Sequence, residues 1–103
     1  MPDESKFDLF RDALGRIPKD ILHDRLKIVL VQMIVFDAEF KGERPIFNCF
    51  KEYTHLTEQE FFAAVNELKE KGFIDAVVQP RDDYPELKEI VFNDFDLDRI
   101  MRY

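Results

Sequence analysis

The sequence is poor in the residues on which many enzymes and metalloproteins depend. It has one cysteine among its 103 residues, so Cys49 excludes an intramolecular disulfide and a thiolate zinc site, and a reducing intracellular compartment is expected. The only serine, Ser5, lies near the start of the chain and offers no credible nucleophile for a Ser-His-Asp arrangement. The three glycines, Gly15, Gly42 and Gly72, are scattered, so no phosphate-binding loop of the Walker type occurs.

Basic charge and long apolar runs are also scarce. Lys and Arg total 15 against 22 Asp and Glu, which gives a net charge of −7 and disfavours non-specific binding to nucleic acid. The longest apolar run, 28–36, is broken by Gln32 and is far shorter than the roughly 20 residues of a spanning helix. The first six residues lack the basic and apolar regions of a secretory signal, so no targeting segment or membrane partner is expected.

Apolar residues are plentiful, and their spacing predicts one α+β domain over 1–103. Hydrophobic residues make up 46% of the chain, which is enough for a folded core. The periodicity predicts helices over 6–14, 20–40 and 47–53, a brief edge strand at 44–46, strands over 73–79 and 87–92, a turn at 93–96 and a last short helix. The domain divides into an N-terminal helical extension at 6–19, a core at 20–92 and a C-terminal helix at 93–103.

The clearest element is a helix over 57–71. Thr57 and Glu60 have the spacing of a capping box, and the helix is expected to end at Lys71-Gly72. Its expected buried face consists of Phe61, Ala64, Val65 and Leu68. The helix at 20–40 is apolar nearly all round in its middle, so both of its faces need cover, and Phe7, Phe10 and Leu14 are candidates to supply part of it.

Three helices followed by a hairpin predict a winged helix, a helix-turn-helix variant whose last helix commonly enters the DNA major groove. The residues 64–74 look like the recognition-helix exit of many winged-helix proteins. The stretches 23–36, 90–93 and 96–100 resemble the C-terminal winged helix of replication initiators, namely the largest origin recognition complex subunit, its cell-division-control relatives and the related yeast silencing protein. This resemblance implies a module of a chromatin- or origin-associated protein, nuclear in a eukaryote, without nucleotide chemistry of its own.

The residues expected to face DNA carry little positive charge. The helix at 57–71 has four Glu and two Lys, and 74–92 has five acidic and two basic residues. Gln59 and Asn66 can read an adenine edge, and Arg81 can enter a minor groove, so these three residues are the candidate DNA contacts. Solvated surface is the simpler interpretation of all three.

Phe62 favours a protein partner over DNA. It falls on the outward face of the predicted recognition helix, and buried aromatic residues commonly anchor interfaces. The predicted interaction surface is Gln59, Phe62, Ala63 and Asn66, for a partner protein or a second copy. The alternative is that Phe62 packs within its own fold, against Tyr53 or the hairpin.

No catalytic or metal constellation is predicted, and neither a cofactor nor a small-molecule substrate is expected. His23 and His55 lie on separate elements and are expected at the surface or at helix ends, whereas Cys49 is expected to be a small buried hydrophobe. The run 94–98 resembles the opening of a calcium loop but lacks its glycine and closing glutamate. Asp96 is instead expected to be a helix N-cap.

Overall fold

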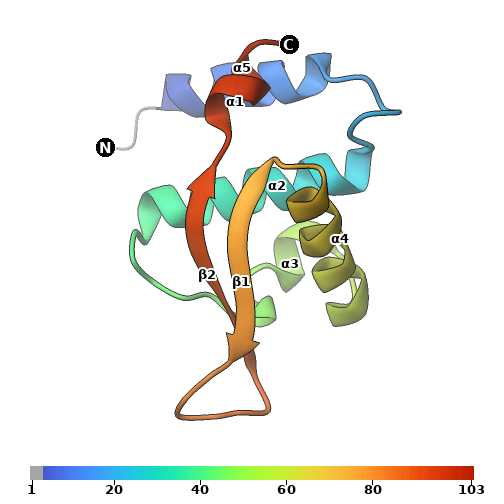
Figure 1. The fold of residues 1–103 in the computed structure, drawn as a ribbon. Coiled ribbons are helices and arrows are strands. Elements are labelled where there is room, and N and C mark those ends of the chain that lie inside the picture. Colours follow the sequence, from blue (N-terminus) through green and yellow to red (C-terminus); the bar gives the residue numbers. More distant parts are fainter. Residues whose placement is uncertain (1–3) are drawn as a thin grey trace.

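The computed structural model describes residues 4–103, and their side chains from residue 8 onward. Five α-helices, one 3₁₀ turn and two strands follow one another in these residues: α1 (Glu4–Arg16), α2 (Asp24–Glu39), η1 (Phe47–Cys49), α3 (Lys51–Thr54), α4 (Glu58–Glu70), β1 (Ile74–Pro80), β2 (Lys88–Phe95) and α5 (Leu97–Met101). Figure 1 shows α2 in the middle, α1 and α5 together at one end, and the hairpin extending to the other. The α+β class, with several helices followed by an antiparallel hairpin, is confirmed.

The core lies where α1, α2, α4 and the base of the hairpin meet. The predicted inner face of α4 is confirmed, because Phe61, Val65 and Leu68 are fully buried and Ala64 is 4% exposed. Phe50 stacks on Phe61 with their ring centroids 5.1 Å apart, which fills the space between α3 and α4. The other buried apolar residues include Phe10, Leu14, Leu26, Val29, Leu30, Met33, Phe73, Ile90 and Ile100.

The N-terminal helix covers part of α2, as predicted, through Phe10 and Leu14, which are both buried. Phe7, predicted on the same face, lies outside the residues whose side chains are described. The predicted helix start at residue 20 was wrong, since the carbonyl of Pro18 accepts the N–H groups of Ile21 and Leu22 in a separate turn. Leu22 still points into the core.

The segment between α2 and α4 differs in detail from the prediction. Residues 44–46 form no strand; Ile46 makes a single bridge to Glu89, and the carbonyl of Pro45 accepts the N–H of Ile90 at 2.9 Å. The predicted helix at 47–53 is divided into η1 and α3. His55 ends α3 in the left-handed conformation, with φ 57°.

The second strand continues beyond its predicted end, so the predicted turn at 93–96 was wrong. Asp75 pairs with Asp94, whereas Ala76 pairs with Phe92, which leaves Asn93 as the extra residue of a β-bulge. The bulge lets β2 reach Phe95. Asp96 then caps α5 as predicted, because its side chain accepts the N–H of Arg99.

Candidate functional site

The predicted interaction surface lies on the outer face of α4. Gln59, Ala63 and Asn66 are exposed, and their spacing places them on one side of the helix. The capping box fixes the start of this helix: Thr57 accepts the N–H of Glu60 at 3.1 Å, and the Glu60 carboxylate accepts the N–H of Thr57 at 3.0 Å. We call Gln59, Phe62, Ala63 and Asn66 the α4 surface.

Phe62 is half-buried and packs mainly within its own fold. Its ring meets that of Phe61 edge-on, with centroids 5.4 Å apart, and the Lys88 ammonium of β2 lies 5.8 Å from its centroid. The sequence predicted Tyr53 or the hairpin as the intramolecular partner of Phe62, and the structure shows the hairpin. Tyr53 instead lies beside α2 and is 64% exposed. The ring of Phe62 is therefore only partly available to a partner.

Polar side-chain contacts join α4 to the start of α2. The Arg25 guanidinium lies 3.1 Å from the Glu60 carboxylate, and His23 Nε2 lies 3.3 Å from that of Glu67. Hydrogen bonds from the backbone and hydroxyl of Thr57, helped by Arg25, lower the pKa of Glu60 below its ordinary value of 4.5. Both contacts are partly exposed and lie at the ends of α2 and α4, outside the α4 surface.

Arg81, the predicted minor-groove contact, is engaged within the hairpin loop. Its guanidinium makes two hydrogen bonds to the carboxylate of Asp83, at 2.9 and 3.0 Å. This hydrogen bonding by Arg81 lowers the pKa of Asp83. Arg81 lines a polar hollow that also contains Arg44 and the buried Glu89, whose side chains lie 3.5 Å apart. No residue of the α4 surface lines this hollow, so the structure does not unite Arg81 with Gln59 and Asn66 in one site.

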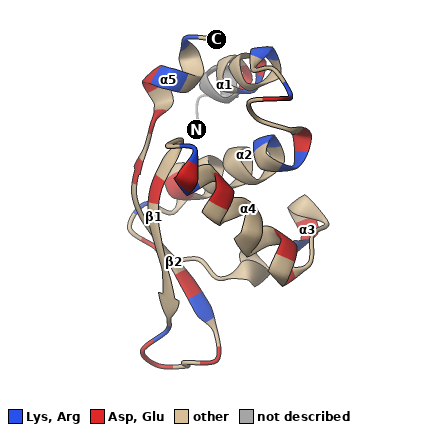
Figure 2. Ribbon diagram, turned by 45° about the vertical axis from the view of Figure 1, so that its right-hand side comes forward, with Lys and Arg blue, Asp and Glu red and all other residues tan. Residues whose placement is uncertain are grey.

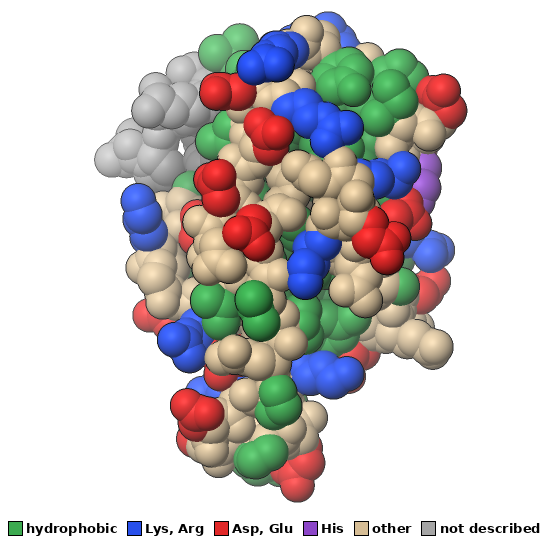
Figure 3. Space-filling model, viewed as in Figure 1, with side chains coloured by type: hydrophobic (Ala, Val, Ile, Leu, Met, Phe, Trp, Pro, Cys, Tyr) green, Lys and Arg blue, Asp and Glu red, His purple; other side chains and the backbone are tan. Residues whose placement is uncertain are grey.

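Acidic residues outnumber basic ones on α4 and the hairpin, the elements that the sequence predicts to face DNA. Figure 2 shows Asp and Glu on α4 and along the hairpin loop. Figure 3 shows Lys and Arg scattered among acidic and hydrophobic side chains on the face that it presents, without a basic patch. An interface with phosphates requires clustered cations, and neither view offers one.

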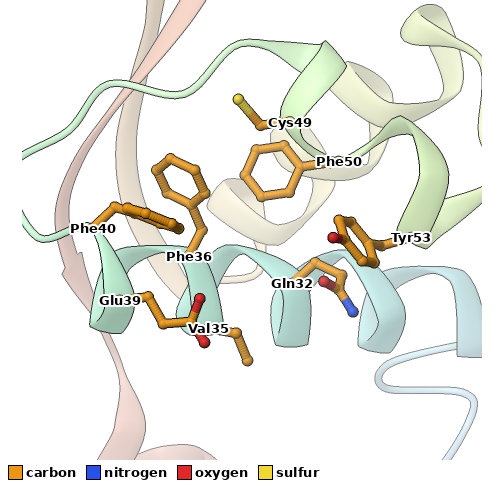
Figure 4. Close-up of a pocket in the computed structure, with 8 residues that line it drawn as sticks. All are labelled: Gln32, Val35, Phe36, Glu39, Phe40, Cys49, Phe50 and Tyr53. Carbon is orange, nitrogen blue, oxygen red and sulfur yellow. The ribbon is translucent and has the colours of Figure 1, made fainter. Parts of the chain in front are cut away.

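A second candidate surface follows the length of α2. A hollow of about 290 Å³ lies between the C-terminal half of α2 and the η1–α3 segment, lined by the eight residues labelled in Figure 4. Three phenylalanines form its apolar wall: the Phe36 centroid lies 5.0 Å from that of Phe40 and 5.5 Å from that of Phe50. Gln32 and Tyr53 lie at the opposite end of the hollow from Phe40 (Figure 4).

An adjoining hollow of about 360 Å³ continues along α2 toward α1. It shares Gln32 and Tyr53 with the first, and its other lining residues are Arg11, Leu14, Gly15, Lys27, Ile28 and Val31. We call the two hollows together the α2 groove. The expectation that both faces of α2 are covered holds only in part, because Ile28 remains 45% exposed in the groove.

Cys49 was predicted to be buried and is exposed. The 3₁₀ turn explains the difference, since it directs Phe50 into the core and Phe47 toward it, and leaves Cys49 on the rim of the α2 groove. His23 and His55 are exposed at helix ends, as predicted. Among the described residues, no group of three or more His, Cys, Asp or Glu is arranged to hold a metal ion.

Comparison with models of known protein families, with curated proteins and with solved structures finds no match to this chain. The resemblance to replication initiators therefore stays a prediction from the sequence. Within residues 4–103, no helix is both long enough and apolar enough to cross a membrane.

Proposed function

We propose that the chain is a non-enzymatic winged-helix module that acts by contact with other proteins. The order α2, α3, α4 and hairpin supports this proposal, because a winged helix has the same succession of three helices and a two-stranded wing. In that arrangement α4 takes the place of the recognition helix. The resemblance of the sequence to replication initiators suggests an origin or chromatin assembly as the setting.

The observation that supports the proposal is the scarcity of cations at the α4 surface, whose own four residues carry no positive charge and where Lys88 of β2 lies over the Phe62 ring. Gln59, Ala63 and Asn66 are uncharged and exposed, and Phe62 adds a half-buried aromatic ring. Each phosphate that a protein neutralises contributes to affinity by releasing counterions, and Gln59, Phe62, Ala63 and Asn66 carry no charge with which to do so. A small uncharged face with an aromatic residue suits a protein contact better.

Two titrations on the same protein test this function against DNA binding. Fluorescence anisotropy with a broad pool of labelled duplexes at low salt is expected to show no complex. Light scattering after size exclusion, from low to high micromolar, is expected to show association. A duplex complex that weakens steeply with added salt would contradict the proposal and favour a DNA-binding winged helix that uses Gln59, Asn66 and Arg81.

One pair of variants sharpens the comparison. Asn66→Arg places a cation on α4, and Asn93→Arg makes the same change at the exposed β-bulge. If α4 faces DNA, only Asn66→Arg strengthens duplex binding; if α4 faces protein, neither variant does. Asn66 suits this test better than Phe62, since Phe62 contributes to the packing around Phe61 and its loss affects folding as well.

A further inference from the structure

The α2 groove is an exposed apolar surface with a centre and two unlike ends. Its two hollows share Gln32 and Tyr53, which therefore mark the centre. On one side of the centre lies Ile28, 45% exposed, and on the other side lies Phe40, 51% exposed. Tyr53, 64% exposed, is among the most exposed large hydrophobic residues of the fold. Such a run of partly covered apolar side chains is a recognised mark of an interaction site.

Charge is distributed unequally between the two ends of the groove. Arg11 and Lys27 line the hollow near α1, and Glu39 is the charged residue that lines the other. Lys27 donates to the carbonyl of Ile17 at 2.7 Å and makes no salt bridge to a carboxylate among the described residues. Arg11 lies 3.9 Å from Asp8, and both side chains are exposed.

A second copy of this chain has charges that complement the basic and acidic ends of the α2 groove. A twofold axis through Gln32, perpendicular to α2, sets the basic end of each groove against the acidic end of the other. The same rotation brings Ile28 of one copy to the phenylalanine-lined hollow of its partner. The amide of Gln32 both donates and accepts hydrogen bonds, so two such amides can pair across the axis.

Overall charge also favours this face for self-association. The chain carries a net charge of −7, so most of its surface repels a second copy. The α2 groove, with two basic residues and one acidic residue in its lining, avoids that repulsion. A basic partner protein would instead be attracted to the acidic α4 and hairpin loop.

We infer that the chain forms a symmetric dimer through the α2 groove, with the two α2 helices antiparallel and Gln32 on the axis. This inference rests on the proposed function, because it names one partner of a protein-contact module. It assigns the second copy to the α2 groove and leaves the α4 surface free for a different protein.

Charge exchange tests the antiparallel arrangement directly. Sedimentation equilibrium from low to high micromolar measures the dimer dissociation constant of the wild type, of Arg11→Glu, of Glu39→Arg and of the double variant. Each single change is expected to weaken the dimer severalfold, and the double change is expected to restore it. Single changes without effect, or a double variant as weak as the singles, would overturn the antiparallel arrangement.

Apolar contact is tested by Ile28→Glu against Leu97→Glu. Both residues are 45% exposed, but Leu97 lies on α5 and outside the groove. Ile28→Glu is expected to weaken the dimer at least about tenfold, the effect of losing an interface anchor, while Leu97→Glu leaves it unchanged. Thermal unfolding shows whether each variant remains folded. Equal effects from the two variants would contradict the assignment.

Cross-linking separates failure of this inference from failure of the proposed function. In a Cys49→Ser background, oxidation of Gln32→Cys is expected to give a covalent dimer, and oxidation of Ala63→Cys is not. The reverse result would place self-association on the α4 surface, which overturns the inference and keeps the interaction function. A monomer at every concentration, with neither disulfide formed, would overturn the dimer. Only the duplex titration decides between protein contact and DNA binding.

Discussion

Arg99 joins the last helix to the end of α4, and its removal is expected to cost about 2–3 kcal/mol of unfolding free energy. Its guanidinium donates from Nη1 to the carbonyl of Lys71, the C-cap of α4, and its Cζ lies 4.2 Å from the centroid of the buried Phe73 ring. A hydrogen bond from a charged donor contributes about 1.5–3 kcal/mol. The stacked ring adds about 0.5–1 kcal/mol, and the two contributions overlap because one group makes both.

Urea denaturation of Arg99→Ala, followed by circular dichroism, measures this loss. Arg99→Met is the matched control, because it keeps the aliphatic stem and removes the charge and the donor; it should lose nearly as much stability as alanine. For a chain of this length each kcal/mol also lowers the melting temperature by roughly 4–8 °C. A loss below about 0.5 kcal/mol in Arg99→Ala would refute the reasoning, since it would show that the contact carries no net energy.

Gly72 provides an independent check through a double-mutant cycle. Its φ of +81° costs any residue with a Cβ about 1–2 kcal/mol, and a Cβ built there would lie 3.3 Å from Nη1 of Arg99. Gly72→Ala should therefore be less destabilising in the Arg99→Ala background than in the wild type, because part of its cost is displacement of the guanidinium. Equal costs in both backgrounds would show that the guanidinium moves aside freely.

Other perturbations test the helix cap, the hairpin loop and the cysteine. Thr57→Ala should lower the unfolding free energy by about 1 kcal/mol in urea denaturation, the usual effect of losing an N-cap. Because the pKa of Glu60 is lowered, its carboxylate stabilises the fold above pH 4.5, and this stabilisation is lost as the pH falls below that value. The difference in unfolding free energy between the wild type and Glu60→Ala should therefore shrink in acid. A difference that stays constant with pH would contradict the direction of the pKa shift. Arg81→Ala should leave the unfolding free energy nearly unchanged, because its pair with Asp83 is exposed; a clear loss of stability would mean that the pair organises the loop. Cys49 should react with a thiol reagent in the native protein, and protection until unfolding would contradict its exposure.

Features set by short sequence patterns were predicted well. The start of α4 depends on Thr57 and Glu60, three residues apart, and its end depends on Gly72, which alone tolerates the left-handed backbone there at no cost. Burial of Phe61 and Leu68 follows from the helical period. In each case the energy that decides the structure comes from neighbours in the chain.

Features set by tertiary contacts were predicted less well. The β-bulge at Asn93 arises from pairing with Asp75 and Ala76 across the hairpin, which no local pattern encodes. The outward direction of Cys49 depends on how η1 packs Phe50 into the core. The apolar middle of α2 predicted that both of its faces are covered, but which of its residues stay exposed depends on where α1 and α3 pack.

Contact between the first and last helices has a consequence for the order of folding. The Arg16 guanidinium donates to the carbonyl of Tyr103 at 2.6 Å, 87 residues away, and Ile100 is fully buried in the core. Closing so long a loop carries an entropic cost that must be met before these contacts form. The contacts of α1 with α5 are therefore expected to form after those of α1 with α2, which lie much closer in the sequence.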